Sequence, residues 1–410
     1  MPSACRAGLA LLKSIVLRNE NFLPPLVAGI GGKAERAAYM KLTSTKNLLG
    51  RQGQRFLIFG RLGTSEDGRY VLEDADGVVG LDLEDAMPGE GIFTEGAFVL
   101  IEGEYTEEER IRVFALGHPP SETRDTARQI CSQIDFLGSG AIPLADEPLL
   151  KEHEAAHDNL AMVFISELHL DHAKSLASFR AMLQGYADAA FIPFAFVLCG
   201  SFSAEPHKPA ALARYQDAFA ALGELLLAFP DILASSHFIF VPSSADPFST
   251  SLLPRQPLPD LIADRLRSKV GPAAAARMHF TSNPTRLVYF AQEIVVSRDD
   301  TMTRMLRNAV RLKDEVADGD LKKFLVSTIL DQVHLHPLPQ SARPVLWEHD
   351  HALRLYPMPT ALVLADKYDR FHLTYEGCRV FNPSSFRGAS FGWTTYYPGT
   401  RVTESSELPQ

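Results

Sequence analysis

The sequence predicts a two-part fold, in which a small all-β barrel is followed by a layered α/β domain. Short β segments separated by turn residues run from about Arg55 to Leu116. From Ala161 onward the pattern changes to strand, turn and helix, repeated. The chain has 410 residues and is 46% hydrophobic, which is enough for a large core and typical of two or three domains.

The barrel segment contains five expected strands punctuated by turn residues. They are Phe56–Gly60, Arg69–Glu73, Val78–Leu83, Ala97–Glu104 and Arg110–Ala115. Five short antiparallel strands in so short a segment are typical of an OB-fold. Between Arg51 and His118 there are 15 acidic and 6 basic residues, a net charge of −9. Because single-strand binding needs a positive groove, we expect this segment by itself not to bind single-stranded DNA.

The α/β part begins with three expected strands at Met162–Ser166, Phe194–Cys199 and His237–Val241. Helices are expected between and after them, and strand-like segments return from Ala361 to Tyr397. The expected helices cover Ala173–Leu183, Pro209–Ala228, Thr301–Leu312 and Leu321–Val333. This alternation indicates βαβ units in a layered α/β domain.

Before the barrel, the sequence predicts an amphipathic helix with Leu12, Ile15 and Val16 facing inward. The expected boundaries are 1–41 for this helical segment, 42–120 for the OB-fold, 121–158 for a linker, 159–400 for the α/β domain and 401–410 for a tail. No apolar run is long enough to span a membrane. The four cysteines form no CxxC pair, which fits a reducing compartment, the cytosol or the nucleus.

Polar residues follow several of the expected strands, where ligands bind in open α/β sheets. The stretches are SELHLD (Ser166–Asp171), CGSF (Cys199–Phe202), VPSSADP (Val241–Pro247) and, later, HLHPLP (His334–Pro339). Their histidines and carboxylates have spacings that suit metal ligands. Residues of the same types at the starts of loops are, however, commonly solvated or capping groups.

In order and context, these stretches resemble the motifs of the calcineurin-like phosphoesterases, DxH, GD, GNH and GHxH. The resemblance aligns Glu167 with the first Asp, His169 with the first His, and His334 and His336 with the last two His. Ser201 replaces the Asp that bridges two metals, and Ser244 and Ala245 replace the Asn ligand and the His that assists the leaving group. No residue matches the family's middle metal-binding His.

These replacements predict a phosphoesterase site without catalysis, because neither serine nor alanine supplies the negative charge that two bridged dications need. We therefore expect no catalytic residue, no bound metal, no cofactor and no enzymatic activity. One alternative stays open: Glu167, His169 and His336 could together hold a single metal in a residual phosphoesterase.

An OB-fold followed by such a domain resembles the B subunits of the replicative DNA polymerases. Four strings between Leu42 and Pro398 favour the epsilon branch, namely Ser282–Asp300, HLHPLPQ, Ala352–Phe371 and Phe381–Phe386. The resemblance implies a nuclear, noncatalytic scaffold that binds the C-terminal metal-binding domain of the catalytic subunit and supports chromosomal replication. It implies contact with DNA only through the complex and no contact with membranes. The corresponding accessory protein of polymerase alpha or delta remains the alternative.

Aromatic residues near the C-terminus are candidates for the partner surface, because aromatic side chains are enriched at protein interfaces. They are Trp347, Tyr356, Phe391, Tyr396 and Tyr397, although these side chains would also suit an ordinary core. Members of the family carry a further N-terminal helical domain that faces components of the replicative helicase. The residues before Leu42 are too few for it, so we expect a truncated chain or one without that contact.

Overall fold

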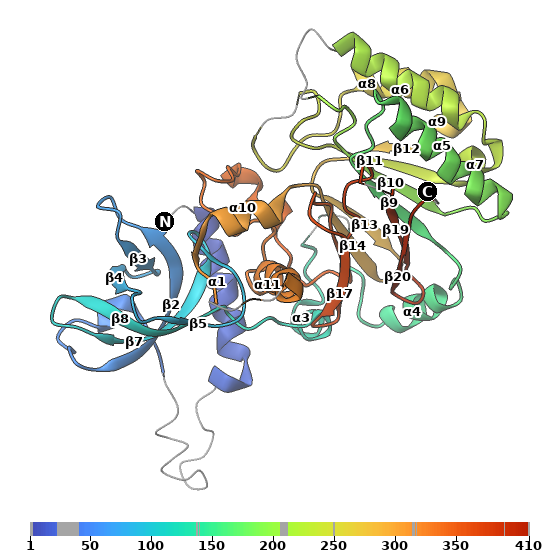
Figure 1. Ribbon diagram of the computed structural model, residues 1–410. Helices are drawn as coiled ribbons and strands as arrows, with labels where there is room; N and C mark the ends of the chain where they lie inside the picture. The colour runs from blue at the N-terminus through green and yellow to red at the C-terminus, as the bar shows by residue number, and fades with distance from the viewer. Residues whose placement is uncertain are drawn as a thin grey trace. The chain divides into compact units, whose positions relative to one another are not determined.

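The computed structural model describes residues 3–22, 41–136, 138, 140–205, 212–248, 251–313, 316, 318–388 and 390–408 (Figure 1). It divides into two compact units. The first unit comprises Met1–Thr123 and Thr303–Met358, and the second comprises Arg124–Met302 and Pro359–Gln410. Residues 303–358, which the sequence placed in the α/β domain, thus belong with the barrel. Over the described residues, no helix has the length and apolar character needed to cross a membrane.

The first unit contains a closed five-stranded barrel (Figure 1). Its strands are β2 (Arg55–Thr64), β3 (Tyr70–Glu73), β4 (Val78–Asp82), β7 (Phe98–Tyr105) and β8 (Arg110–Gly117). They pair in the order β2-β3-β4-β8-β7, and β7 returns to β2 to close the ring. The β4–β8 pairing is parallel and the others are antiparallel. All five strands predicted from the sequence are confirmed.

Other elements of the first unit are α1 (Ser3–Arg18), η1 (Glu20–Phe22), β1 (Leu42–Thr43), η2 (Thr45–Asn47), β5 (Met87–Pro88), β6 (Phe93–Thr94), β15 (Ala309–Arg311), α11 (Asp318–Asp331) and η4 (Trp347–Leu353). In α1, the three side chains predicted to face inward are at most 2% exposed, as expected. The rest of the predicted segment 1–41, from residue 23 to residue 40, lies outside the described residues.

Polar contacts explain why residues 303–358 belong with the barrel. The Gln332 side chain accepts a hydrogen bond from Phe98 N at 2.7 Å and donates one to Phe98 O at 2.6 Å. The helix predicted for Thr301–Leu312 ends at Arg307 as α10 (Thr301–Arg307), and the following residues form β15, which pairs with β6. Pairing with a strand distant in the sequence therefore overrides the local helical pattern.

The second unit contains two sheets. The six-stranded sheet has the order β12 (Met278–Phe280), β11 (His237–Val241), β10 (Ala195–Cys199), β9 (Met162–Ser166), β19 (Trp393–Tyr397), β20 (Val402–Ser406). The five-stranded sheet has the order β13 (Thr285–Tyr289), β14 (Gln292–Ser297), β16 (Ala361–Leu364), β18 (Cys378–Asn382), β17 (Phe371–Tyr375). Strands β9, β10 and β11 are parallel and confirm the three predicted strands.

The helices of the second unit are α3 (Arg124–Cys131), α4 (Glu147–Ala155), α5 (Ala173–Asp188), α6 (Leu212–Leu226), α7 (Pro230–Ser235), α8 (Asp260–Val270) and α9 (Pro272–Ala275). Both α3 and α4 lie in the stretch 121–158 that was expected to be a linker. The predicted start of the α6 helix at Pro209 lies outside the described residues.

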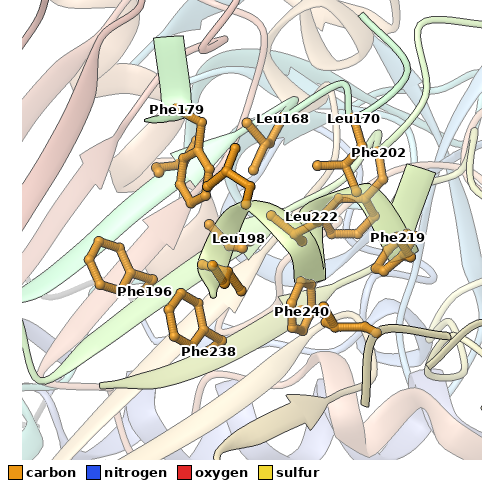
Figure 2. Packing of buried hydrophobic residues seen from close by; sticks show 14 of the residues in the cluster. Leu168, Leu170, Phe179, Phe196, Leu198, Phe202, Phe219, Leu222, Phe238 and Phe240 are labelled. Carbon is orange, nitrogen blue, oxygen red and sulfur yellow. The ribbon is translucent and has the colours of Figure 1, made fainter. Parts of the chain in front are cut away.

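Alternate residues of the central strands face different cores, as the two-residue repeat of a strand requires. Phe164 of β9 lies between the two sheets, with its ring 5.1 Å from that of Phe381. Its neighbour Val163 belongs to the cluster between the six-stranded sheet and the helices. Figure 2 shows this cluster, in which Phe240 of β11 and Phe219 of α6 belong to the same group of buried rings. The central strands are thus packed on both faces, against the helices on one side and against the five-stranded sheet on the other, which holds their carboxyl ends in place.

Candidate functional site

The first predicted site residue, Glu167, directly follows β9. Its backbone has a positive φ of 59°, a conformation that is uncommon for residues other than glycine, and its amide donates to Cys199 O at 3.0 Å. The carboxylate is buried and contacts two cations. Arg298 Nη2 lies 3.2 Å and Lys367 Nζ 3.3 Å from Glu167 Oε1. The residue aligned with a metal ligand is therefore already paired with positive charge from the chain itself.

Asp246, which the sequence did not single out, holds the loops after β10 and β11 together. Its Oδ1 accepts hydrogen bonds from Phe202 N at 2.8 Å and Tyr215 Oη at 2.9 Å. Its Oδ2 accepts one from Ser243 N at 2.7 Å. Burial and the nearby Asp246 charge raise the pKa of Tyr215 well above its usual range, so this phenol stays protonated and donates.

The predicted site residues of these two loops differ in their surroundings. The Ser201 hydroxyl lies 3.0 Å from the Ser243 hydroxyl, a neutral alcohol and not a base that could activate a nucleophile. Ser244 is exposed and Ala245 is partly exposed. Packing explains why glycine stands at position 200, because a Cβ there would collide with the Asp246 carboxylate and the Ser243 amide. The loops are therefore packed around a structural carboxylate.

His169 is buried and interacts with a cation. Arg387 Nη1 lies 3.0 Å from His169 Nδ1, so the guanidinium donates and the imidazole accepts. Burial lowers the pKa of His169, which keeps the ring neutral and able to accept this bond. His169 Nδ1 is therefore already engaged in a hydrogen bond with Arg387.

His334 and His336 belong to the first unit and follow helix α11, not a strand. They line a cavity of about 60 Å³ together with Arg61, Asp350 and Arg354. His334 Nδ1 accepts from the His336 amide at 3.1 Å, and its Nε2 lies 3.3 Å from Asp350 Oδ1. Burial raises the pKa of Asp350, but the His334 hydrogen bond and the Arg354 charge outweigh it and bring the pKa to about 2. Both histidines are therefore described with Asp350 and Arg354, as residues of the first unit.

These surroundings do not fit the metals of a phosphoesterase. Within the described residues, no three His, Cys, Asp or Glu side chains gather in a way that could hold a metal ion. Glu167 faces Arg298 and Lys367, and His169 faces Arg387. A dication would meet positive side chains where the family needs carboxylates.

The candidate partner residues differ in their accessibility. Tyr396 is wholly buried and donates to Gln292 Oε1 at 2.9 Å, and Tyr356 is 9% exposed and donates to Glu122 at 2.8 Å. Both are core residues, so they are not part of an exposed surface. Trp347, Phe391 and Tyr397 remain partly exposed.

The most informative residues that the sequence did not single out lie at the ends of β14 and β16. Arg298 and Asp300 follow β14, and Lys367 follows shortly after β16. The signal is the Arg-Asp-Asp run Arg298–Asp300, which is separated from the apolar segment Ile294–Val296 by Ser297 alone. In this sequence, charged residues immediately after a buried strand therefore point to the candidate site as well as the histidines do.

Two protein families match consecutive parts of this chain. The family described as the B subunit of DNA polymerase alpha/epsilon matches residues 162–373, and the OB-fold domain described as DNA polymerase epsilon subunit 2-like matches residues 3–120. The predicted N-terminal OB-fold is confirmed by this match, and the predicted layered α/β domain by the observed topology.

Curated relatives match nearly the whole chain. DNA polymerase epsilon subunit 2 of Bos taurus is 36% identical over 406 residues, which cover 98% of this chain and 75% of the relative. DNA polymerase epsilon subunit 2 of Homo sapiens is also 36% identical, over 98% and 75%, and that of Drosophila melanogaster is 33% identical, over 98% and 74%. The chain therefore belongs to the family of DNA polymerase epsilon B subunits, the accessory subunits of a replicative DNA polymerase.

Proposed function

We propose that this chain is the noncatalytic scaffold subunit of a nuclear DNA polymerase epsilon, and that it binds the C-terminal metal-binding domain of the catalytic subunit. The observation that carries the noncatalytic role is the pairing of Glu167 with Arg298 and Lys367. This pairing engages the carboxylate that the resemblance aligns with a metal ligand. The family match supports the choice of the epsilon complex over the alpha and delta complexes.

Within that role, each unit offers partly exposed aromatic residues as contacts for the partner, Trp347 in the first unit and Phe391 and Tyr397 in the second. A stable contact between subunits buries about 2,000 Å² or more and is commonly centred on aromatic side chains. Components of the replicative helicase are expected to reach this chain through the assembled polymerase, and DNA to contact the complex as a whole.

The partner assignment is tested by co-purification of the tagged chain from dividing cells. We expect the polymerase epsilon catalytic subunit at about equal amounts, because a scaffold is held permanently. Trp347→Glu and Phe391→Glu are each expected to reduce the recovered catalytic subunit at least tenfold, since a charge at the centre of an interface costs several kcal/mol. Ile192→Glu is a matched control, because Ile192 is 41% exposed and is not among the proposed contacts.

Two results would count against this assignment. Full recovery of the catalytic subunit with both glutamate variants would place the interface elsewhere. Recovery of the alpha or delta catalytic subunit in place of epsilon would reject the epsilon assignment itself.

The same account predicts that the full chain does not bind single-stranded DNA appreciably by itself. The barrel region carries −9, and four of its aromatic residues, Phe56, Phe59, Phe93 and Tyr105, are buried and cannot stack on bases. Fluorescence anisotropy with a labelled oligothymidylate should show no binding at micromolar protein, because phosphate contacts would release few counterions. Salt-dependent binding with a micromolar dissociation constant would contradict the prediction.

A further inference from the structure

The Arg298 side chain occupies a central place at the strand ends of the second unit. It is 3% exposed, and all three of its nitrogens donate hydrogen bonds. Nε donates to Gly200 O. Nη1 donates to Asp300 Oδ1 at 2.8 Å and to Ala365 O at 3.0 Å, and Nη2 donates to Glu167 Oε1 at 3.2 Å.

The acceptors come from both sheets. Glu167 and Gly200 follow β9 and β10 of the six-stranded sheet, whereas Asp300 and Ala365 follow β14 and β16 of the five-stranded sheet. One guanidinium therefore joins the carboxyl ends of four strands, two from each layer. Carboxylate and carbonyl oxygens are also the ligands that hard divalent cations prefer.

Arg298 and Lys367 bring positive charge to the carboxylates of Glu167 and Asp300 without an added ion. Burial opposes the charge of Arg298, but the carboxylates of Asp300 and Glu167 raise its pKa, so the guanidinium stays protonated. Lys367 Nζ lies 3.3 Å from Glu167 and 3.5 Å from Asp300, which brings a second cation to the same two carboxylates. Adding a dication would leave excess positive charge in a buried site, which is costly.

The position of Arg298 is fixed by its own backbone. Its amide donates to Asn283 Oδ1 at 3.0 Å, and its carbonyl accepts from Asn283 Nδ2 at 2.7 Å and from Arg255 Nη1 at 3.2 Å. The side chain thus leaves β14 from an anchored point and has little freedom to move away from Glu167.

We propose that Arg298 is a built-in cation that replaces the phosphoesterase metals, joining the strand ends of both sheets and keeping divalent ions out. The replacement is independent of the partner, because every contact that carries it lies within the second unit. It differs from simple loss of the ligands, since the chain keeps an oxygen-rich site and fills it with its own positive charge.

The test compares four forms of the full chain by thermal unfolding, each with EDTA and with Mn²⁺. Arg298→Met keeps the length of the side chain but removes its charge and donors, Arg298→Lys keeps the charge, and Arg180→Met is a matched control on the exposed face of α5. We expect the wild-type protein and the Arg180→Met variant to have equal melting temperatures that Mn²⁺ does not change.

Arg298→Met should melt roughly 10 °C lower in EDTA, because it leaves buried carboxylates unpaired. Mn²⁺ should restore several degrees of this loss, because the ion can take the oxygens that Arg298 engaged. Arg298→Lys should fall between the wild-type protein and the methionine variant and should not respond to Mn²⁺.

Three results would overturn the proposal. One is a melting temperature for Arg298→Met equal to that of Arg180→Met. The second is a loss of stability that Mn²⁺ does not restore, which would make Arg298 an ordinary buried ion-pair partner. The third is stabilisation of the wild-type protein by Mn²⁺. If Arg298→Met does not fold, Arg298→Lys decides, with a fall of several degrees supporting the proposal and an unchanged value overturning it.

Discussion

Replacing Asp246 with alanine is expected to lower the free energy of unfolding of the second unit by about 4 kcal/mol. The change removes the carboxylate that accepts from three buried donors, namely Phe202 N, Ser243 N and the Tyr215 hydroxyl. Because these donors belong to α6 and to the loops after β10 and β11, the loss separates segments that one carboxylate now joins. Urea unfolding followed by circular dichroism measures the effect.

Two further variants make this result specific. Asp246→Asn keeps an oxygen for two of the three donors and should lose about half as much. Asp188→Ala removes an exposed carboxylate at the end of α5 and should change the stability by less than about 0.5 kcal/mol. A loss below about 1 kcal/mol for Asp246→Ala would show that the carboxylate does not hold the loops.

The first unit is expected to lose about 2 kcal/mol of stability between pH 7.5 and pH 5 through one histidine. The His118 ring stacks on Phe93 at 4.2 Å, and its Nδ1 accepts a hydrogen bond from Gln332 Nε2 at 3.0 Å. Burial lowers the pKa of His118 from 6.5 to about 3. Because the pKa of His118 is lower in the folded state, its contribution to stability is fully present above the unfolded-state pKa of 6.5. This contribution is lost as the pH falls toward 3.

The pH dependence is measured as the free energy of unfolding from urea titrations at pH 7.5, 6 and 5. His118→Gln should be less stable at pH 7.5 but should flatten the dependence by about 2 kcal/mol, since glutamine does not titrate. His349→Gln, a change at an exposed histidine of the same unit, should keep the dependence of the wild-type protein. An equally steep dependence in His118→Gln would exclude His118 as its source.

The strands of the barrel and the first three strands of the α/β domain could be predicted because their signals are local. Each is an apolar or alternating run bounded by turn residues, so the sequence around His237–Val241 carries all the information needed. The same local reading failed for Ala309–Arg311, where pairing with β6 decides the structure. Residues 303–358 joined the barrel for a similar long-range reason, the contacts of Gln332 with Phe98.

The site could be predicted only in part. Glu167 and Ser201 were correctly placed after strands, because each follows its strand within two residues. His334 and His336 were aligned with a strand-end motif, but a helix precedes them, and the spacing of two histidines cannot show which element comes first. Arg298 was missed because its role depends on bringing the ends of β9 and β14 together, and this contact spans 131 positions of the sequence.

The role proposed for this chain is to bind a polymerase catalytic subunit. It is tested most directly by mixing the full chain with the C-terminal domain of the polymerase epsilon catalytic subunit and measuring mass by size-exclusion chromatography with light scattering. The account predicts a single species with the mass of a 1:1 complex, and two separate species with the corresponding alpha or delta domains. Two separate species with the epsilon domain at micromolar concentrations would contradict it.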